Sequence, residues 1–418
     1  METLINPSRS TWDALCQRPL ADDPVVTERV KAILARVKEK GDDALRELSL
    51  EIDGRALESI EISQNELNAV RVSPEIEKAI GEAAIHITAF HAAQKPREVR
   101  VVTAPGVTCI QRPVPIGKVG LYIPGGSAPL FSTVLMLALP ARLAGCREII
   151  LCTPAQSPEV LYAARVCGVS RIFRVGGAQA IAAMAYGTES IPRVDKIFGP
   201  GNRYVTTAKQ LLSAGTVAID MPAGPSEVMV LADDTTPAAF AAADLLSQAE
   251  HGPDSQVMLV ADTLETAEAI LKEVERQKAL LPRCGIADKA LEKSRTVVLS
   301  NLEDRIDFAN TYAPEHLIIE CAEPWKVADA VTAAGSVFIG PYTPESAGDY
   351  ASGTNHTLPT CGWARAFSGV NMDSYYRKMT LQEITREGLA GLRNTIVNMA
   401  VAEGLDAHAN AVKVRTDE

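Results

Sequence analysis

Residues 118–126 read Lys118-Val119-Gly120-Leu121-Tyr122-Ile123-Pro124-Gly125-Gly126, a short apolar run that ends in a tight, glycine-rich turn. Runs of this length, bounded by Gly and Pro, are typical of buried strands in parallel sheets. The pattern returns at 148–154, 171–177 and 196–202, with helix-forming residues between, and a last apolar run at 216–220 ends the series. Strands that alternate with helices predict a parallel, doubly wound α/β sheet.

A second series of predicted strands follows at 227–231, 256–260, 317–320 and 336–339, again with helices between them. We therefore expect two Rossmann-like α/β modules. The helices predicted in the first hundred residues need a partner core, and we expect them to pack on the module of this second series. The division predicted is an N-terminal extension (1–22), a discontinuous module (23–121 with 229–370), a second module (122–228) and a C-terminal extension (371–418).

The two ends of the chain are predicted to be mostly helical. Asp23-Pro24 and Ser73-Pro74 each have the form of a helix start. Near the C-terminus, Thr380-Leu381-Gln382-Glu383 has the form of a capping box and predicts a helix to Glu403. An extended tail is expected over 405–415. This C-terminal extension is too small to hold a full core, so we expect it to dock on another surface.

The composition is that of a globular protein, with 47% apolar and 22% charged residues. The net charge of −11, without a long run of one sign, argues against surfaces for nucleic acid or anionic membranes. The longest apolar stretch, 134–140, is far too short to cross a bilayer, and the first residues lack a signal core. The 8 cysteines include no C-x-x-C pair, which is typical of a reducing compartment, and we expect a cytoplasmic protein.

One predicted helix end carries a pair of potential metal ligands. The Ala-rich run after Thr236-Pro237 predicts a helix that Gly252-Pro253 ends, with Gln248 and His251 in its last turn. Side chains three residues apart share one helix face, about 5–6 Å apart at Cβ, which suits two ligands of one metal ion. Taken alone, the pair is more simply explained as a polar helix end at which His251 interacts with the helix dipole.

Other polar segments offer acid–base groups and further ligands. Glu315-His316 begins a predicted strand, and an adjacent carboxylate and imidazole in a closed site can accept protons with different pKa values. Asp349 lies in a predicted glycine-rich loop that continues to Asn355-His356. With His408, Asp349 extends the set of candidate zinc ligands. In isolation a surface Glu-His dipeptide and a plain turn explain the first two segments more simply.

Three glycine-rich turns follow strands of one predicted sheet, where backbone can approach a phosphate group. Such turns place a crevice at the carboxyl ends of parallel strands. Because no stretch matches G-x-G-x-x-G, tight turns without a ligand are an equal alternative. If a nicotinamide cofactor binds there, Tyr122 offers a ring for stacking, and Gln179 and Asn202 offer amides for hydrogen bonds.

Taken in order, these segments resemble the histidinol dehydrogenase family of zinc-dependent enzymes. The resemblance runs from about residue 23 to the C-terminus, with no departure at a position that the family uses. The matching segments are 120–126, 175–180, 198–202, 224–227, 247–255, 313–317, 345–356 with 358–360, and 403–408.

The resemblance implies an oxidoreductase that acts on a CH–OH group. Its substrate is L-histidinol, oxidised through L-histidinaldehyde to L-histidine with two NAD molecules and one zinc ion per subunit, the last step of histidine biosynthesis. By resemblance, Glu315 and His316 accept protons, and the zinc ligands are Gln248, His251, Asp349 and His408. Tyr122, Gln179 and Asn202 contact NAD. The substrate contacts are Ser226, His316, Glu403 and the metal ligands.

The resemblance also implies a homodimer, in which Glu403 and His408 of the C-terminal extension reach the neighbouring subunit's site. Two other function classes are a related zinc-dependent dehydrogenase of another small alcohol and a non-catalytic binding protein. Glu403 and His408, which suit an amino-imidazole substrate, argue against the first, and the full catalytic set argues against the second. A thiohemiacetal on Cys109 or Cys146 is the chemical rival, but neither has neighbours that would lower its thiol pKa, which favours structural thiols.

Overall fold

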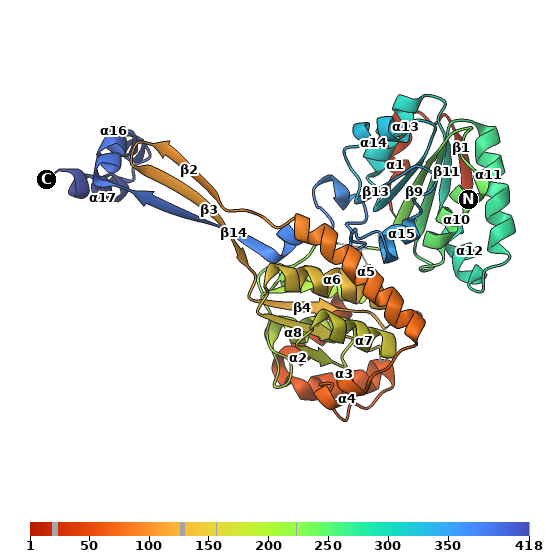
Figure 1. Cartoon of the computed structure of the whole chain (residues 1–418), viewed down its shortest axis with the longest axis horizontal. Helices are drawn as coiled ribbons and strands as arrows, with labels where there is room; N and C mark the ends of the chain where they lie inside the picture. The colour runs from red at the N-terminus through yellow and green to blue at the C-terminus, as the bar shows by residue number, and fades with distance from the viewer. Residues whose placement is uncertain (19–23, 126–129, 156, 223, 418) are drawn as a thin grey trace.

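The computed structural model of the chain describes residues 1–18, 24–125, 130–155, 157–222 and 224–417. Over these residues the strands form three sheets, with orders β1-β11-β10-β9-β12-β13, β6-β5-β4-β7-β8 and β14-β3-β2. Figure 1 shows two α/β modules and a long arm that projects from them and ends in helices α16 and α17. The predicted α/β class with parallel sheets is confirmed.

The six-stranded sheet is parallel throughout and includes the start of the chain. Every residue of β9 and β10 is buried, as expected for strands that are covered on both faces. Residues 2–5, for which the sequence predicted no element, form an edge strand beside β11. The strands are β1 (Glu2–Ile5), β9 (Glu227–Ala232), β10 (Gln256–Ala261), β11 (Arg295–Val298), β12 (His316–Glu320) and β13 (Ser336–Ile339).

Helices cover both faces of this sheet. On one face α10, α11 and α12 pack against Val228 and Val230, and on the other α1, α13 and α14 pack against Met229 and Leu231. Successive side chains of a strand point to opposite faces, so one apolar strand supplies both cores. The helices are α1 (Trp12–Leu15), α10 (Ala238–Ala249), α11 (Leu264–Lys278), α12 (Cys284–Glu292), α13 (Leu302–Tyr312), α14 (Pro324–Ala330) and α15 (Glu345–Tyr350), with short 3-10 turns η1 (Arg9–Thr11) and η2 (Trp363–Arg365). A third 3-10 turn, η3 (Met372–Tyr375), packs in the core of the other module.

The five-stranded sheet is also parallel and lies between two helical layers. Helix α6 is buried along nearly its whole length, which explains its apolar sequence. No helix of the described residues is long and apolar enough to cross a membrane. The elements are β4 (Lys118–Tyr122), α6 (Phe131–Ala144), β5 (Glu148–Cys152), α7 (Pro158–Cys167), β6 (Arg171–Phe173), α8 (Gly177–Tyr186), β7 (Lys196–Phe198), α9 (Arg203–Ser213) and β8 (Ala218–Ile219).

The early helices pack on the five-stranded sheet, which corrects the expectation that they join residues 229–370. Helix α2 contacts α8 and α9, and α5 contacts α6. The reason is the apolar stripe of α2, in which Val30 and Leu34 share a core with Ile181 of α8. The helices are α2 (Pro24–Lys40), α3 (Asp42–Asp53), α4 (Gln64–Ala69) and α5 (Pro74–Ala93), with the starts predicted at Pro24 and Pro74.

The arm consists of β2 (Val99–Ala104), β3 (Val107–Pro115) and β14 (Tyr376–Ile384), which pair antiparallel, and two terminal helices, α16 (Arg386–Ala402) and α17 (Asp406–Thr416). All nine residues of β14 pair with β3. Sequence segments almost three hundred residues apart therefore meet in one ribbon, and only this ribbon joins the terminal helices to the modules in Figure 1.

Two local predictions for the arm are wrong. Residues 380–383 lie in strand β14, because pairing with β3 overrides the capping-box pattern. The helix begins only after Thr385, whose side chain accepts a hydrogen bond from the backbone of Gly388. Residues 406–416 form α17 instead of an extended tail, because that segment packs on α16 and gains a partner that a free tail lacks.

Candidate active site

A cleft of about 1300 Å³ lies between the two modules. One wall is the amino-terminal edge of the six-stranded sheet, where residues just before β9, β10 and β12 reach the cleft. The opposite wall is the carboxyl-terminal edge of the five-stranded sheet, including the turn 199–202 after β7. Ligands of parallel α/β sheets usually bind at the carboxyl-terminal edge. Here only the five-stranded sheet presents that edge to the cleft.

Glu315 and His316 are buried at the start of β12, and both face this cleft. The backbone N–H of Glu227 donates to Glu315 Oε2 at 2.9 Å, and His316 Nδ1 donates to the carbonyl oxygen of Glu227 at 3.2 Å. Because a carbonyl can only accept, the imidazole carries its proton on Nδ1. The other nitrogen, Nε2, is buried and has no hydrogen-bond partner among the described residues, so it can accept a proton.

Burial shifts the pKa values of these two groups in opposite directions. It lowers the pKa of His316 to about 3 and raises the pKa of Glu315 well above its usual range. The imidazole is therefore neutral at neutral pH, which is the state that a proton acceptor needs.

Gln248 and His251 lie at the end of α10 and line the cleft. The amide nitrogen of Gln248 is 3.4 Å from His251 Nδ1, which agrees with the predicted proximity. His251 Nδ1 donates to the carbonyl oxygen of Ser247 at 3.0 Å, so Nε2 is the nitrogen left for a metal ion. Metal-binding histidines usually hold their second N–H in this way. Gln248 Oε1 is buried without a hydrogen-bond partner in the described part of the chain.

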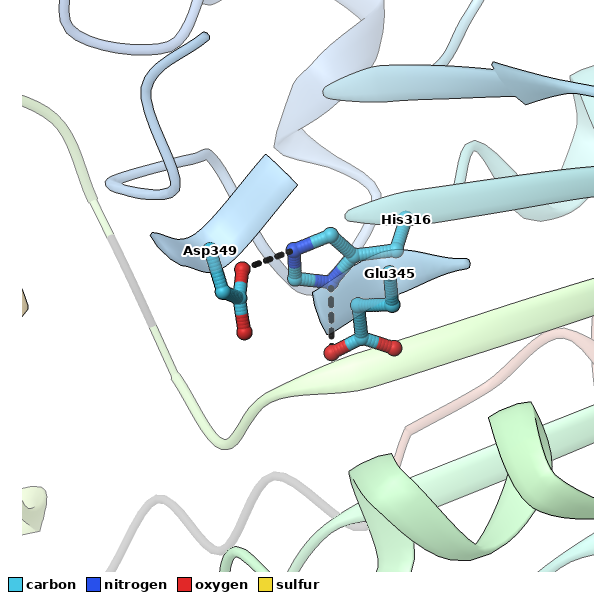
Figure 2. A group of neighbouring side chains, drawn as sticks. All are labelled: His316, Glu345 and Asp349. Atoms are coloured by element: carbon cyan, nitrogen blue, oxygen red, sulfur yellow. Dashed lines mark ion pairs between the residues drawn. The ribbon is translucent and has the colours of Figure 1, made fainter. Parts of the chain in front are cut away.

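Figure 2 shows the imidazole of His316 between two carboxyl groups of α15. His316 Nε2 is 3.9 Å from Asp349 Oδ1, and His316 Nδ1 is 3.8 Å from Glu345 Oε1. Asp349 is helical, which corrects its prediction as a loop residue: Glu345 to Tyr350 form one short helix. The sequence reading missed Glu345, although its spacing of four residues from Asp349 is the pattern of neighbours on one helix face.

The donor set fits a divalent metal ion. Both carboxyl oxygens of Glu345 are buried without a hydrogen-bond partner among the described residues. Burial raises the pKa of Glu345 well above its usual range and that of Asp349 to about 7. Buried, unpaired carboxylates that repel one another are costly, and a cation offsets that cost. Asp349, His316 and Glu345 offer ligand atoms that all lie within 4.8 Å of one another, and Gln248 and His251 line the same cleft. These donors are of the mixed nitrogen and oxygen kind that zinc accepts.

Comparison with known proteins identifies the family. The family model described as histidinol dehydrogenase matches residues 16–416. The chain is 52% identical over 425 residues to histidinol dehydrogenase of Bacteroides fragilis, covering 100% of this chain and 99% of the relative. It is 52% identical over 416 residues to that of Shewanella oneidensis, covering 96% and 95%. The crystal structure of histidinol dehydrogenase from Elizabethkingia anophelis matches with a TM-score of 0.96 at 49% identity, covering 100% of this chain and 98% of that one.

This chain belongs to the histidinol dehydrogenase family. The resemblance predicted from the sequence is confirmed, and the chain is an oxidoreductase of that family.

The predicted site residues of the C-terminal extension are not brought to the cleft within one chain. Glu403 follows α16, His408 lies in α17, and both side chains are exposed. Figure 1 places both helices at the tip of the arm, away from the modules. Three of the four predicted metal ligands, Gln248, His251 and Asp349, line the cleft of one chain.

The residues predicted to contact NAD and substrate divide into two groups. Asn202 and Ser226 line the cleft, and Asn202 also caps α9 by accepting two backbone hydrogen bonds. Tyr122 and Gln179 are buried and are not among the cleft-lining residues. The Tyr122 hydroxyl accepts a hydrogen bond from the backbone N–H of Gly177 at 3.1 Å. The side chain therefore supports the glycine-rich turn at 176–177, and its buried ring is not exposed for stacking.

His356 is a second cleft residue to which the sequence assigned no role. Its Nε2 lies 3.4 Å from Ser132 Oγ, so this side chain links the loop after α15 to helix α6 of the other module. Burial lowers the pKa of His356 to about 4, which keeps the ring neutral. The only signal in the sequence was its position seven residues after Asp349.

Proposed function

We propose that this protein oxidises L-histidinol to L-histidine through L-histidinaldehyde, with two NAD molecules as hydride acceptors and zinc as the metal, as the last step of histidine biosynthesis. The observation that carries the proposal is His316 Nε2. It is a buried, neutral acceptor without a partner in the described residues, and it lies 3.9 Å from the predicted metal ligand Asp349. An alcohol held beside Asp349 would bring its hydroxyl proton near that nitrogen.

His316 is proposed to take the hydroxyl proton in the first oxidation and to act again in the second. Its ring orientation is fixed by the hydrogen bond from Nδ1 to Glu227, so Nε2 stays directed towards Asp349, which also lines the cleft. NAD, when bound at the opposite wall of the cleft, supplies the hydride acceptor. The cleft walls come from different modules, which suits a substrate held on one side and a dinucleotide on the other.

Glu315 is proposed to accept a proton from the water that hydrates the aldehyde. Its Oε2 is held by the Glu227 N–H, and the carboxyl group lines the cleft beside His316. Gln248, His251 and Asp349 would hold the zinc ion. When bound, zinc would orient the imidazole and amino nitrogens of the substrate, and its charge would favour the ionised form of neighbouring carboxyl groups.

The protein is further proposed to be a homodimer with shared sites. Exposed apolar side chains occur on every strand and helix of the arm except β3, including Val102, Met379, Met399, Leu405 and Val414. Such exposure is typical of an interaction surface. Docking the arm on a second copy would cover these side chains and would deliver Glu403 and His408 to the partner's cleft, and two-fold symmetry makes the exchange mutual.

The test of the reaction is the yield of NADH on L-histidinol. Two NADH per histidinol support the four-electron oxidation, whereas one NADH identifies a simple alcohol dehydrogenase and no NADH rejects the proposal. A chelator should abolish the activity and zinc should restore it. Full activity of the metal-stripped protein would contradict the zinc requirement. Because mixed nitrogen and oxygen sites discriminate poorly, cobalt or manganese is expected to restore activity in part.

A further inference from the structure

The N-terminal segment contributes a buried cation next to the cleft wall. Arg18 donates from Nε to Glu227 Oε2 at 3.1 Å, and its guanidinium lies 3.5 Å from the ring centre of Tyr312. The Arg18 side chain is 8% exposed and that of Glu227 is 0% exposed. An ion pair this deeply buried is costly to form, so it is weak evidence of a purely stabilising role.

Glu227 touches both proposed proton acceptors through its backbone. Its N–H donates to Glu315 and its carbonyl oxygen accepts from His316, so the peptide groups on either side of one residue orient the two acceptors. Glu227 is also the first residue of β9, next to Ser226 of the cleft wall. A rotation of this residue would move both hydrogen bonds together.

The side chain of Glu227 is held at a second point. Its Oε1 accepts a hydrogen bond from the backbone of Cys361, a residue with a φ of 56° that few side chains adopt without support. The preceding residue, Thr360, lines the cleft and accepts from the backbone of Gly224. Arg18 thus donates to one oxygen of the Glu227 carboxylate, and the backbone N–H of Cys361 donates to the other.

We propose that Arg18 and Glu227 are positioning residues, which hold the peptide groups that aim Glu315 and His316 into the cleft. The kinetic part of the test rests on the proposed oxidation of L-histidinol. A misplacement of about 1 Å in a catalytic group can cost on the order of 10²-fold in rate. The proposal gives Arg18, which lies in the N-terminal extension, a positioning role that the sequence did not assign.

The chain offers a matched control for removing Arg18. Arg9 belongs to the same N-terminal segment, pairs with Asp304 and Asp307, and lies 4.9 Å from the ring centre of Trp12. Arg9→Met thus removes two exposed ion pairs and a cation–π contact without touching Glu227, whereas Arg18→Met removes a buried ion pair and a cation–π contact. We expect Arg18→Met to lower kcat by roughly 10–100-fold with KM within about threefold of wild type, and Arg9→Met to leave both near wild type.

A double-mutant cycle separates positioning from general damage. The cycle is measured on oxidation of the alcohol, the stage in which Glu315 has no proposed role. If Arg18 acts through His316, Arg18→Met should cost that stage little further rate once His316→Asn has removed the acceptor. If Arg18 only supports the fold, the two losses multiply. Multiplying losses would overturn the proposal, as would wild-type kcat in Arg18→Met. Should Arg18→Met fail to fold, Arg18→Lys decides: it keeps the charge but loses the fork geometry, and a wild-type kcat in that variant rejects the proposal.

A spectroscopic readout makes the test independent of turnover. In protein labelled with ¹⁵N-histidine, His316 should give the signals of a ring protonated on Nδ1, assigned by their loss in His316→Asn. We expect Arg18→Met, but not Arg9→Met, to shift these signals towards a mixture of tautomers. Absence of NADH formation by the wild-type protein would reject the proposed function, and the ring signals would still decide the positioning role. Unchanged His316 signals in Arg18→Met would overturn it.

Discussion

The cleft and the tip of the arm both carry predicted site residues, but they hold them in opposite surroundings. In the cleft, Glu315 and His316 are buried, backbone-held and shifted in pKa. At the tip, Glu403 and His408 are exposed on helices joined to the modules by a three-stranded ribbon. Charges and hydrogen bonds interact more strongly in a closed, low-dielectric site, and of these two places in the described chain the cleft is the closed one. The difference supports a site that is completed by a second copy.

The largest expected effect belongs to the cleft. Glu315→Gln should slow oxidation of the aldehyde far more than oxidation of the alcohol, because only the second stage needs activated water. His316→Asn should slow both stages, since His316 is the proposed proton acceptor in each. Losses of about 10²–10⁴-fold are typical for removal of a general base. The measurement is NADH formation with histidinol and with histidinaldehyde as separate substrates.

Glu320→Gln is the matched control for Glu315→Gln. Glu320 is buried at the last position of β12, the strand that Glu315 directly precedes, and is not among the residues that line the cleft. The Glu320→Gln variant should therefore oxidise both the alcohol and the aldehyde at rates near those of the wild type. Small and equal losses in both stages for both active-site variants would remove the assigned roles.

We expect His408 of the arm to serve the cleft of the partner subunit and not the cleft of its own chain. His408→Ala should be nearly inactive, although His408 is exposed and remote from the cleft of its own chain. A mixed dimer of Glu315→Gln and His408→Ala subunits then has one site with both lesions and one wild-type site. Activity should return to about half of normal per dimer.

One outcome of the mixing experiment would contradict the shared site. If His408 serves its own chain, each site of the mixed dimer keeps one lesion and the activity stays near zero. Mixed dimers verified by two different affinity tags, yet inactive, would therefore reject the shared site.

The apolar surface of the arm should hold the dimer together. Met399, on α16, is 61% exposed. If the arm docks on a second copy, Met399→Asp buries a charge at the interface and should raise the dimer dissociation constant roughly tenfold or more. Leu280→Asp is the control, because Leu280 is 75% exposed on a module. Equal sedimentation of the two variants across a dilution series would argue against docking through α16.

Local sequence signals predicted the modules well and the arm poorly. Glycine-rich turns and apolar runs mark β4 and β9 because both signals act within a few residues. The capping-box pattern at 380–383 is equally local, but pairing with β3, which lies far away in the sequence, decides the outcome. The same holds for α2, since an apolar stripe predicts that a helix packs but does not identify its partner.

The candidate site shows the same limit. The adjacent pair Glu315-His316 and the helical pair Gln248 and His251 could be predicted, because neighbours in sequence are neighbours in space. Glu345 was missed because its importance comes from burial beside His316, which no local pattern encodes. Arg18 was missed for the same reason, since its partner Glu227 lies 209 positions away.

The smallest predicted effect concerns stability, and it again separates the modules from the arm. Glu320 is buried and its Oε2 lacks a hydrogen-bond partner among the described residues. Burial, aided by the charge of Asp244, raises the pKa of Glu320 to about 8, against about 4.3 for an unfolded glutamate. The folded state favours the protonated form. This contribution to stability is therefore full below about pH 4 and is lost as the pH rises towards 8.

Glu320→Gln removes that dependence, because the amide is neutral at every pH. It should stabilise the protein by on the order of 1–3 kcal/mol near pH 9 and by much less near pH 5. Urea unfolding at the two pH values measures the difference. Glu383→Gln, at an exposed position of the arm strand β14, is the control and should change neither value. An equal gain in stability for Glu320→Gln at both pH values would contradict the prediction. It would show that ionisation of Glu320 does not lower the free energy of unfolding, because a neighbouring group stabilises the ionised carboxylate.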